Sequence, residues 1–126
     1  MKLQLDALAG LEGAMEFHRD RHVVLAGNLA NLDTPAFAPF DLVPQRAAGS
    51  NGEVVRTHAR HLGTEGPAAG REVVIDQSSA PRKDGNQVSL ERELAKIDAN
   101  RVRYLASSKL VSRRLAILRY AAGDGV

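Results

Sequence analysis

The chain has 126 residues, a formal net charge of +2 and no cysteine, which is the length of one domain and excludes disulfides, thiolate zinc sites and cysteine nucleophiles. Aromatic residues make up only 4% of it, so burial has to come from Leu, Val, Ile and Ala, which suits extended contacts between helices better than a globular core. The start of the chain lacks the apolar run of a secretory signal peptide and no stretch approaches a membrane span, so we expect any export to need no cleaved signal.

Residues 1–33 carry the first pattern, an apolar stripe with heptad spacing. Eight positions alternate three and four residues apart, and six of them are apolar: Leu8, Leu11, Met15, His18, His22, Leu25, Leu29 and Leu32. This pattern predicts one helix that packs along another. The helix has to end before Pro35, because the residue preceding a proline is pushed out of the helical region.

Glycines in this first helix leave two interpretations open. Gly10, Gly13 and Gly27 each cost about 1 kcal/mol relative to alanine inside a helix. Either the helix is simply weak, or it becomes stable only when neighbouring chains pack against it, since packing rather than propensity stabilises most helices.

Residues 34–87 form a loop-rich insert. All five prolines and six of the eleven glycines lie there, and a long segment without regular structure is usually functional or disordered. Two short runs, Gly52 to Arg56 and Arg71 to Asp76, are candidate strands that together would make a short β-hairpin.

Residues 88–126 predict a second, longer helix. Its stripe has the same spacing and is mostly apolar: Leu90, Leu94, Ile97, Arg101, Tyr104, Ser108, Val111, Leu115, Leu118 and Ala122. Ser89 is a candidate N-cap, and Glu91 and Glu93 stand in the first turn, where the helix dipole favours anions. Gly123 is a natural stop. The helix would span roughly 45–50 Å at 1.5 Å per residue.

The two helices together predict an all-α fold, an antiparallel coiled-coil hairpin that carries the insert. Their charges are opposite. From Leu3 to Leu32 four acidic residues face two arginines, a net of −2, whereas from Val88 to Tyr120 eight basic residues face three acidic ones, a net of +5. A basic helix can bind nucleic acid, a membrane or an acidic protein surface, and the first helix offers such a surface within or between chains.

Catalytic and metal-binding patterns are weak. His18 and His22 lie four residues apart on one helix face, a spacing that can bind metal, but no third ligand is evident, and both occupy the packing stripe. His58 and His61 lie among arginines without a glycine-rich phosphate loop. A stripe position and a solvated loop are therefore the better interpretations, and the basic segment has no recognisable DNA-binding motif.

Three stretches resemble a known family. Residues 25–37, LAGNLANLDTPAF, are similar to the amino-terminal motif of flagellar rod and hook proteins, in which two asparagines precede Thr-Pro-Gly-Tyr. The matching residues are Asn28, Asn31, Thr34 and Pro35, while Ala36 and Phe37 replace the glycine and tyrosine. We expect the two asparagine amides to hydrogen-bond backbone where the chain leaves the helix.

The carboxy-terminal stretch resembles the B type of proximal rod protein. The similar residues are 84–93, Asn100, Arg103, Tyr104 and 110–119, which include Arg113 and Arg114, together with residues 56–62 in the insert. The resemblance implies a structural subunit of the flagellar rod, the drive shaft that crosses the periplasm, exported by the type III apparatus and needed for motility. It also implies other rod proteins, the rod-base adaptor, the MS ring and the export gate as partners, further copies of the chain in the rod, and no cofactor, nucleic acid or small-molecule substrate.

Two other classes remain as alternatives. One is a free-standing helical interaction module that binds a partner helix in solution. The other is a small metal- or phosphate-dependent enzyme that uses the four histidines. A rod subunit alone should be weakly folded or polymerise, a module should form a defined small oligomer, and an enzyme should be a folded monomer or dimer with metal.

Overall fold

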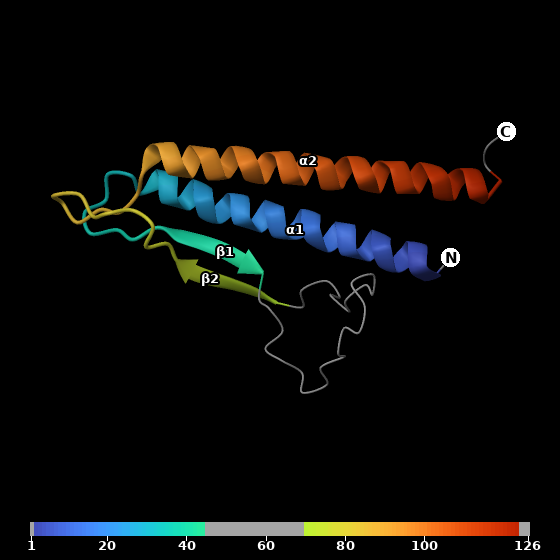
Figure 1. The fold of residues 1–126 in the computed structure, drawn as a ribbon, viewed down its shortest axis with the longest axis horizontal. Coiled ribbons are helices and arrows are strands. Elements are labelled where there is room, and N and C mark those ends of the chain that lie inside the picture. Colours follow the sequence, from blue (N-terminus) through green and yellow to red (C-terminus); the bar gives the residue numbers. More distant parts are fainter. Residues whose placement is uncertain (1, 45–69, 124–126) are drawn as a thin grey trace, which may run out of the picture.

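The structure is a computed structural model, and it describes residues 2–44 and 70–123. The element order is helix α1 (Lys2–Ala30), strand β1 (Phe40–Pro44), strand β2 (Arg71–Ile75) and helix α2 (Leu90–Ala121). Figure 1 shows α1 and α2 side by side and antiparallel, so that both termini lie at one end, with α1 between α2 and the small sheet. Neither helix contains a stretch long and apolar enough to cross a membrane.

The sheet has two antiparallel strands, paired from Phe40 with Ile75 to Pro44 with Arg71. The candidate strand at Arg71 is therefore present as β2, but its partner is β1, which the sequence did not single out. The other candidate strand, Gly52 to Arg56, lies outside the described residues. Leu42 is the buried member of β1, because alternate residues of a strand face opposite sides and its side turns toward α1.

The ends of the long helix differ in detail from the sequence expectation. Ser89 does precede α2, yet its side chain forms no capping hydrogen bond. At the other end, α2 stops at Ala121, and Gly123 has a φ of 91°, in the left-handed region where glycine has no steric penalty.

The turn after α1 holds a strained alanine. Ala36 has a φ of 57°, a region that costs an L-residue with a Cβ roughly 1–2 kcal/mol. Its N–H donates to Asp84 O at 3.0 Å, and Gly85 lies directly against it, so that a Cβ on Gly85 would be 3.4 Å from Ala36 Cα. Contact with the 84–86 loop therefore holds the backbone of Ala36 in place despite its cost.

Replacing Ala36 with glycine should relieve this strain. We expect Ala36→Gly to raise the free energy of unfolding by roughly 0.5–1 kcal/mol, since removing the steric penalty outweighs the extra entropy of the unfolded glycine. Urea unfolding followed by circular dichroism measures the change. The control is Ala38→Gly, at a position without positive φ, which should lower stability. If both variants lose stability equally, Ala36 is not strained.

Candidate functional site

A buried amide joins three elements where the two helices meet the sheet. Asn28, on α1, donates from Nδ2 to Phe40 O on β1 at 2.7 Å and to Glu93 Oε2 on α2 at 2.8 Å. Its Oδ1 accepts from Phe40 N at 2.9 Å. Asn28 and Glu93 are each 1% exposed, so these hydrogen bonds form away from water. Because the Asn28 side chain hydrogen-bonds both β1 and α2, it fixes the positions of these two elements along α1.

Glu93 extends this contact into a charged cluster. Lys96 donates from Nζ to Glu93 Oε1 at 2.7 Å and also to Asp76 Oδ2, just after β2. We call Asn28, Glu93, Lys96 and Asp76 the polar junction. A buried carboxylate is tolerated only when it is paired and hydrogen-bonded, and here both Glu93 oxygens have donors. Lys96 thus anchors the end of the sheet to α2.

Ionisation within the junction follows from these contacts. Burial opposes ionisation of Asp76, but hydrogen bonds from Lys96 and Ser78 outweigh it and lower the Asp76 pKa to about 2. Burial also opposes the charge on Lys96, and again the two carboxylates outweigh it, so the Lys96 pKa is raised. Both partners therefore keep their charges across the neutral range.

A second buried amide closes the end of α1. Asn86, which is fully buried, donates from Nδ2 to Asn31 O and Leu32 O, each at 3.0 Å, and to Thr34 O at 2.6 Å. Its Oδ1 accepts from Val88 N at 2.7 Å. These carbonyls lie in the turn that follows α1, and Asn86 supplies their donor from the segment that leads into α2.

The asparagines of the amino-terminal motif behave as expected from the sequence. Asn28 bonds the backbone of β1, as described, and Asn31 donates from Nδ2 to Gly27 O at 2.9 Å. Thr34 Oγ1 in turn donates to Asn31 Oδ1 at 3.1 Å. Pro35 is exposed. The motif is therefore a local set of hydrogen bonds that shapes the exit from α1.

Phe37 takes part in this turn through its ring and its backbone. Its ring packs edge-on against Phe40, with 6.0 Å between ring centroids. Its carbonyl accepts from Gln87 N at 3.0 Å. The ring contact holds the turn against β1 and the backbone bond holds it against the segment that precedes α2. Neither contact uses the hydroxyl of the tyrosine that Phe37 replaces.

His18 forms a second set of hydrogen bonds between α1 and α2, farther from the loop end. Asn100, 1% exposed, donates from Nδ2 to His18 O at 2.6 Å, and its Oδ1 lies 2.7 Å from His18 Nδ1. That ring nitrogen therefore carries a proton. His22 is exposed, and the described residues contain no group of three potential metal ligands. His58 and His61 lie outside the described part of the chain.

Ion pairs attach the sheet to α1. Arg21 donates to both oxygens of Asp41, at 2.7 and 2.8 Å, and the hydrogen bonds from this pair raise the Arg21 pKa. Arg71 on β2 meets Glu16, at 2.9 Å, and Asp20. The acidic side of α1 is thus partly neutralised by the sheet and not by α2.

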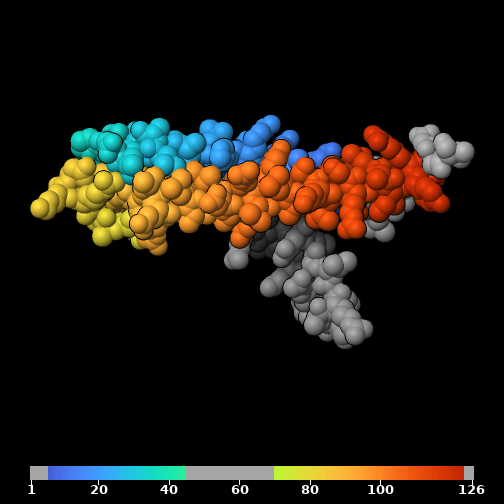
Figure 2. Space-filling view, turned by 90° about the horizontal axis from the view of Figure 1, so that it is seen from above, coloured from blue at the N-terminus to red at the C-terminus, as the bar shows by residue number. Residues whose placement is uncertain are grey.

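The apolar residues, in contrast, are mostly not enclosed. The only buried hydrophobic residues of the described part are Leu25, Leu42 and Val88. Nine large apolar side chains of α2 are exposed: Leu90, Leu94, Val102, Tyr104, Leu105, Leu110, Leu115, Ile117 and Tyr120. Figure 2 shows the long face that α2 presents, with α1 along one edge. Exposed apolar surface of this extent marks an interaction site.

The predicted packing stripes lie differently on the two helices. On α1, Leu25 is fully buried, and the other apolar positions are half-buried: Leu8, Leu11, Met15, Leu29 and Leu32. On α2, three predicted positions are half-buried and four are exposed, namely Ile97, Val111 and Leu118, then Leu90, Leu94, Tyr104 and Leu115. The residues that α2 buries are instead Glu93 and Asn100.

Sequence reasoning missed these two polar contacts. From the sequence, Glu93 was interpreted as an anion favoured by the dipole of the first helical turn, and Asn100 was named only for the family resemblance. Neither was expected to be buried, because charged and amide side chains normally lie in solvent. The available signal was that both lie seven residues apart, the spacing of one helix face. Arg103, Arg113 and Arg114 are exposed and form no ion pair with a described residue.

Comparison with known proteins gives a consistent set of relatives. The chain is 33% identical over 111 residues to the flagellar basal body rod protein FlgB of Cereibacter sphaeroides, covering 86% of this chain and 87% of that protein. It is 35% identical over 94 residues to FlgB of Aquifex aeolicus, covering 71% of each, and 24% identical over 109 residues to FlgB of Bacillus subtilis, covering 84% of each. No protein-family model matches the chain.

The polar junction predicts a large penalty for a small change at Asn28. Asn28→Asp keeps the shape but removes both N–H donors and places a carboxylate against Glu93. We expect a loss of about 3–5 kcal/mol in the free energy of unfolding, as for a buried charge left unpaired. Asn31→Asp, at a more exposed site, should cost about 1 kcal/mol or less. Equal losses in urea unfolding would contradict the role of Asn28.

Asp76 predicts a specific pH dependence. Its folded pKa of about 2 lies below its ordinary value of about 3.9, so its stabilisation is complete above about pH 4 and is lost as the pH falls toward 2. Asp76→Asn should therefore lower the urea midpoint at pH 5 and flatten its fall between pH 5 and pH 2.5. The exposed Asp33→Asn variant is the control. A variant at Asp76 with the wild-type pH profile would contradict this account.

Proposed function

Because the chain belongs to the FlgB family of flagellar basal body rod proteins, we propose that it is a structural subunit of the proximal rod and has no catalytic role. In this proposal many copies assemble helically into the drive shaft that crosses the periplasm, and the assembly is needed for motility. No cofactor, nucleic acid or small-molecule substrate takes part.

The exposed apolar surface of α2 is the observation that carries this proposal. Nine large apolar side chains on one helix are exposed, whereas three hydrophobic residues of the whole described part are buried. A helix with apolar residues on several sides is normally buried on those sides. The fold therefore has a defined arrangement but little enclosed core, which is what a subunit that is completed by its neighbours requires.

The arrangement of the helices supports the same function. The terminal helices lie antiparallel (Figure 1), and their stripes have the spacing of a coiled coil. We propose that α1 and α2 pack as such a pair within the rod wall, with further copies covering the exposed residues of α2. Long helices packed along their length suit a shaft that carries torque, because load is shared by many contacts.

The expected neighbours follow from the family. We propose contacts with other rod proteins, the adaptor at the rod base, and the MS ring and type III export gate, with export that involves no cleaved signal. The basal body rod is the site named for the relatives, and the same location is proposed for this chain.

An exposed apolar residue of α2 should matter for assembly but not for the fold. Ile117 is 60% exposed, so Ile117→Glu should change the unfolding free energy by less than about 0.5 kcal/mol. In cells that lack the native copy, however, it should abolish rod assembly and swimming, while Ile117→Leu preserves both. Secreted protein and recovered basal bodies are measured together, because normal secretion separates failed assembly from failed export. Normal rods with Ile117→Glu would contradict the role of this surface.

A further inference from the structure

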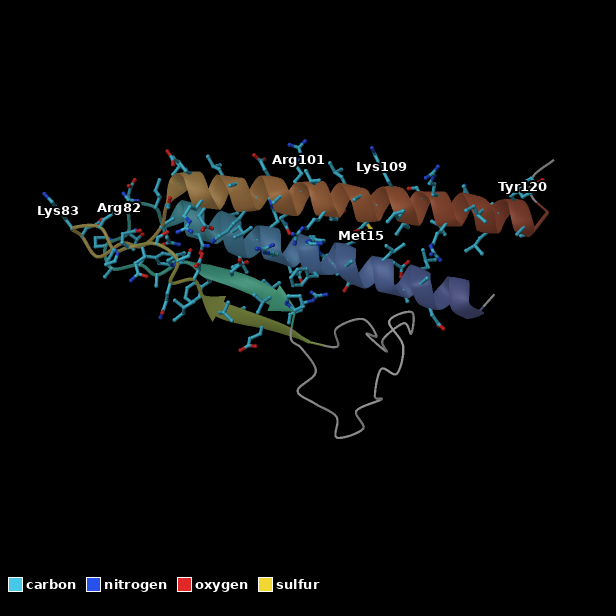
Figure 3. The ribbon with its side chains drawn as sticks, in the orientation of Figure 1. Met15, Arg82, Lys83, Arg101, Lys109 and Tyr120 are labelled. Carbon is cyan, nitrogen blue, oxygen red and sulfur yellow. The ribbon has the colours of Figure 1, made fainter. Side chains whose placement is uncertain are left out.

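We propose that the outward face of α2 docks against the amino-terminal half of α1 in a second copy of this chain, the half that carries Asp6 and Glu12. This inference rests on the proposed function, since it names the contact that joins neighbouring subunits. The outward face is a stripe of exposed residues at helical spacing: Val102, Leu105, Lys109, Arg113, Ala116 and Tyr120. In Figure 3, Lys109 lies on the side of α2 that faces away from α1.

The terminal half of α2 carries an excess of positive charge, and two of its cations, Lys109 and Arg113, lie on the outward face. From residue 99 to residue 122, α2 and its cap contain six cations and no carboxylate: Arg101, Arg103, Lys109, Arg113, Arg114 and Arg119. Within residues 2–44 and 70–123, none of the six takes part in an ion pair. A concentrated charge of one sign selects a partner of the opposite sign and orients it.

The shape of the face fits a helix. A shallow hollow on α2 is lined by Lys109 and Arg113, by Leu110, and by the small residues Ala106, Ser108, Ser112 and Ala116. Small side chains let a second helix approach closely, as ridges of one helix pack into grooves of another. The two cations beside the hollow then reach carboxylates on the incoming helix.

The first helix of another copy has the complementary features. Asp6 and Glu12 are exposed and pair with no described side chain. Gly10 is half-buried and lines a hollow with Pro44, Arg71 and Arg103, although a Cβ there would meet no described atom within 4 Å. A glycine lowers helix stability at this position, and among the described residues no atom fills the space beside it, which can admit a neighbouring backbone.

The contact has to be made between copies. No ion pair of the described part joins α1 to α2, although the start of α1 and the end of α2 lie at the same end of the molecule (Figure 1). The two surfaces therefore meet when copies stand side by side at similar height. Since the surfaces differ, the contact is head-to-tail and repeats along a ring or helix.

Charge reversal and its rescue test this contact in cells that lack the native copy. Lys109→Glu with Arg113→Glu should lower recovered rods at least about tenfold, because the reversed charges repel the same carboxylates at every copy, with unchanged secretion and circular dichroism. Adding Asp6→Lys and Glu12→Lys to the same chain should restore most of the loss. The control, Arg19→Glu with Lys83→Glu, makes the same change of charge at two exposed positions outside the face and should assemble normally.

The outcomes separate this inference from the proposed function. If the unaltered chain restores no rods, the proposed function itself fails. If it does, and the reversed chain also assembles normally, the inference is overturned. Loss of rods without rescue from α1 overturns it too. The full chain is finally tested on vesicles of phosphatidylcholine with phosphatidylserine, because a cationic apolar helix face also suits an anionic membrane. Binding that disappears in the reversed chain, without rescue of its rods, would assign the face to lipid.

Discussion

Two helices and two short strands cannot enclose a hydrophobic core, and this constraint explains the rest of the structure. With three hydrophobic residues buried in the described part, apolar burial alone cannot set how the helices lie. Polar side chains take that role. Asn28, Asn86, Glu93 and Asn100 are the residues buried instead, and each bridges segments that are distant in the sequence. Every buried side-chain nitrogen and oxygen of residues 6–44 and 70–123 has a hydrogen-bond partner.

Polar pairing also explains why the arrangement is specific. An apolar stripe can slide along its partner by one turn at little cost, but an amide between a strand backbone and a carboxylate fits at one register only. The hydrogen bond between Asn28 and Glu93 fixes the register of α1 against α2 at the loop end. The hydrogen bond between Asn100 and His18 fixes the same register farther along the helices. Beyond Asn100 toward the termini no described residue of either helix is fully buried. Among the described residues, buried contacts therefore hold the helix pair at its loop end and not toward the termini, the part that we propose neighbouring copies cover.

The sequence predicted the elements better than their contacts. Heptad spacing located both helices, and the candidate strand from Arg71 to Asp76 is present as β2 (Arg71–Ile75). β1 was missed because Pro39 and Pro44 made its segment resemble a loop. On α2, Ile97, Val111 and Leu118 of the predicted stripe are half-buried, Leu90 and Leu94 are exposed, and the fully buried residues are Glu93 and Asn100. The spacing of apolar residues shows which side chains share a helix face, but the contacting residues decide which face is buried. Here those contacting residues, Asn28 and His18, lie far away in the sequence from α2.

The central claim is that the loop end of the helix pair is complete in one chain and that the terminal half is completed by other copies. Hydrogen exchange of backbone amides, compared between the free chain and assembled rods, measures this most directly. We predict that the amides of Phe40, Val88 and Glu93 are protected in both states. Those from Leu105 to Tyr120 should exchange quickly in the free chain and become protected in the rod. Equal protection of that segment in the two states would contradict the account.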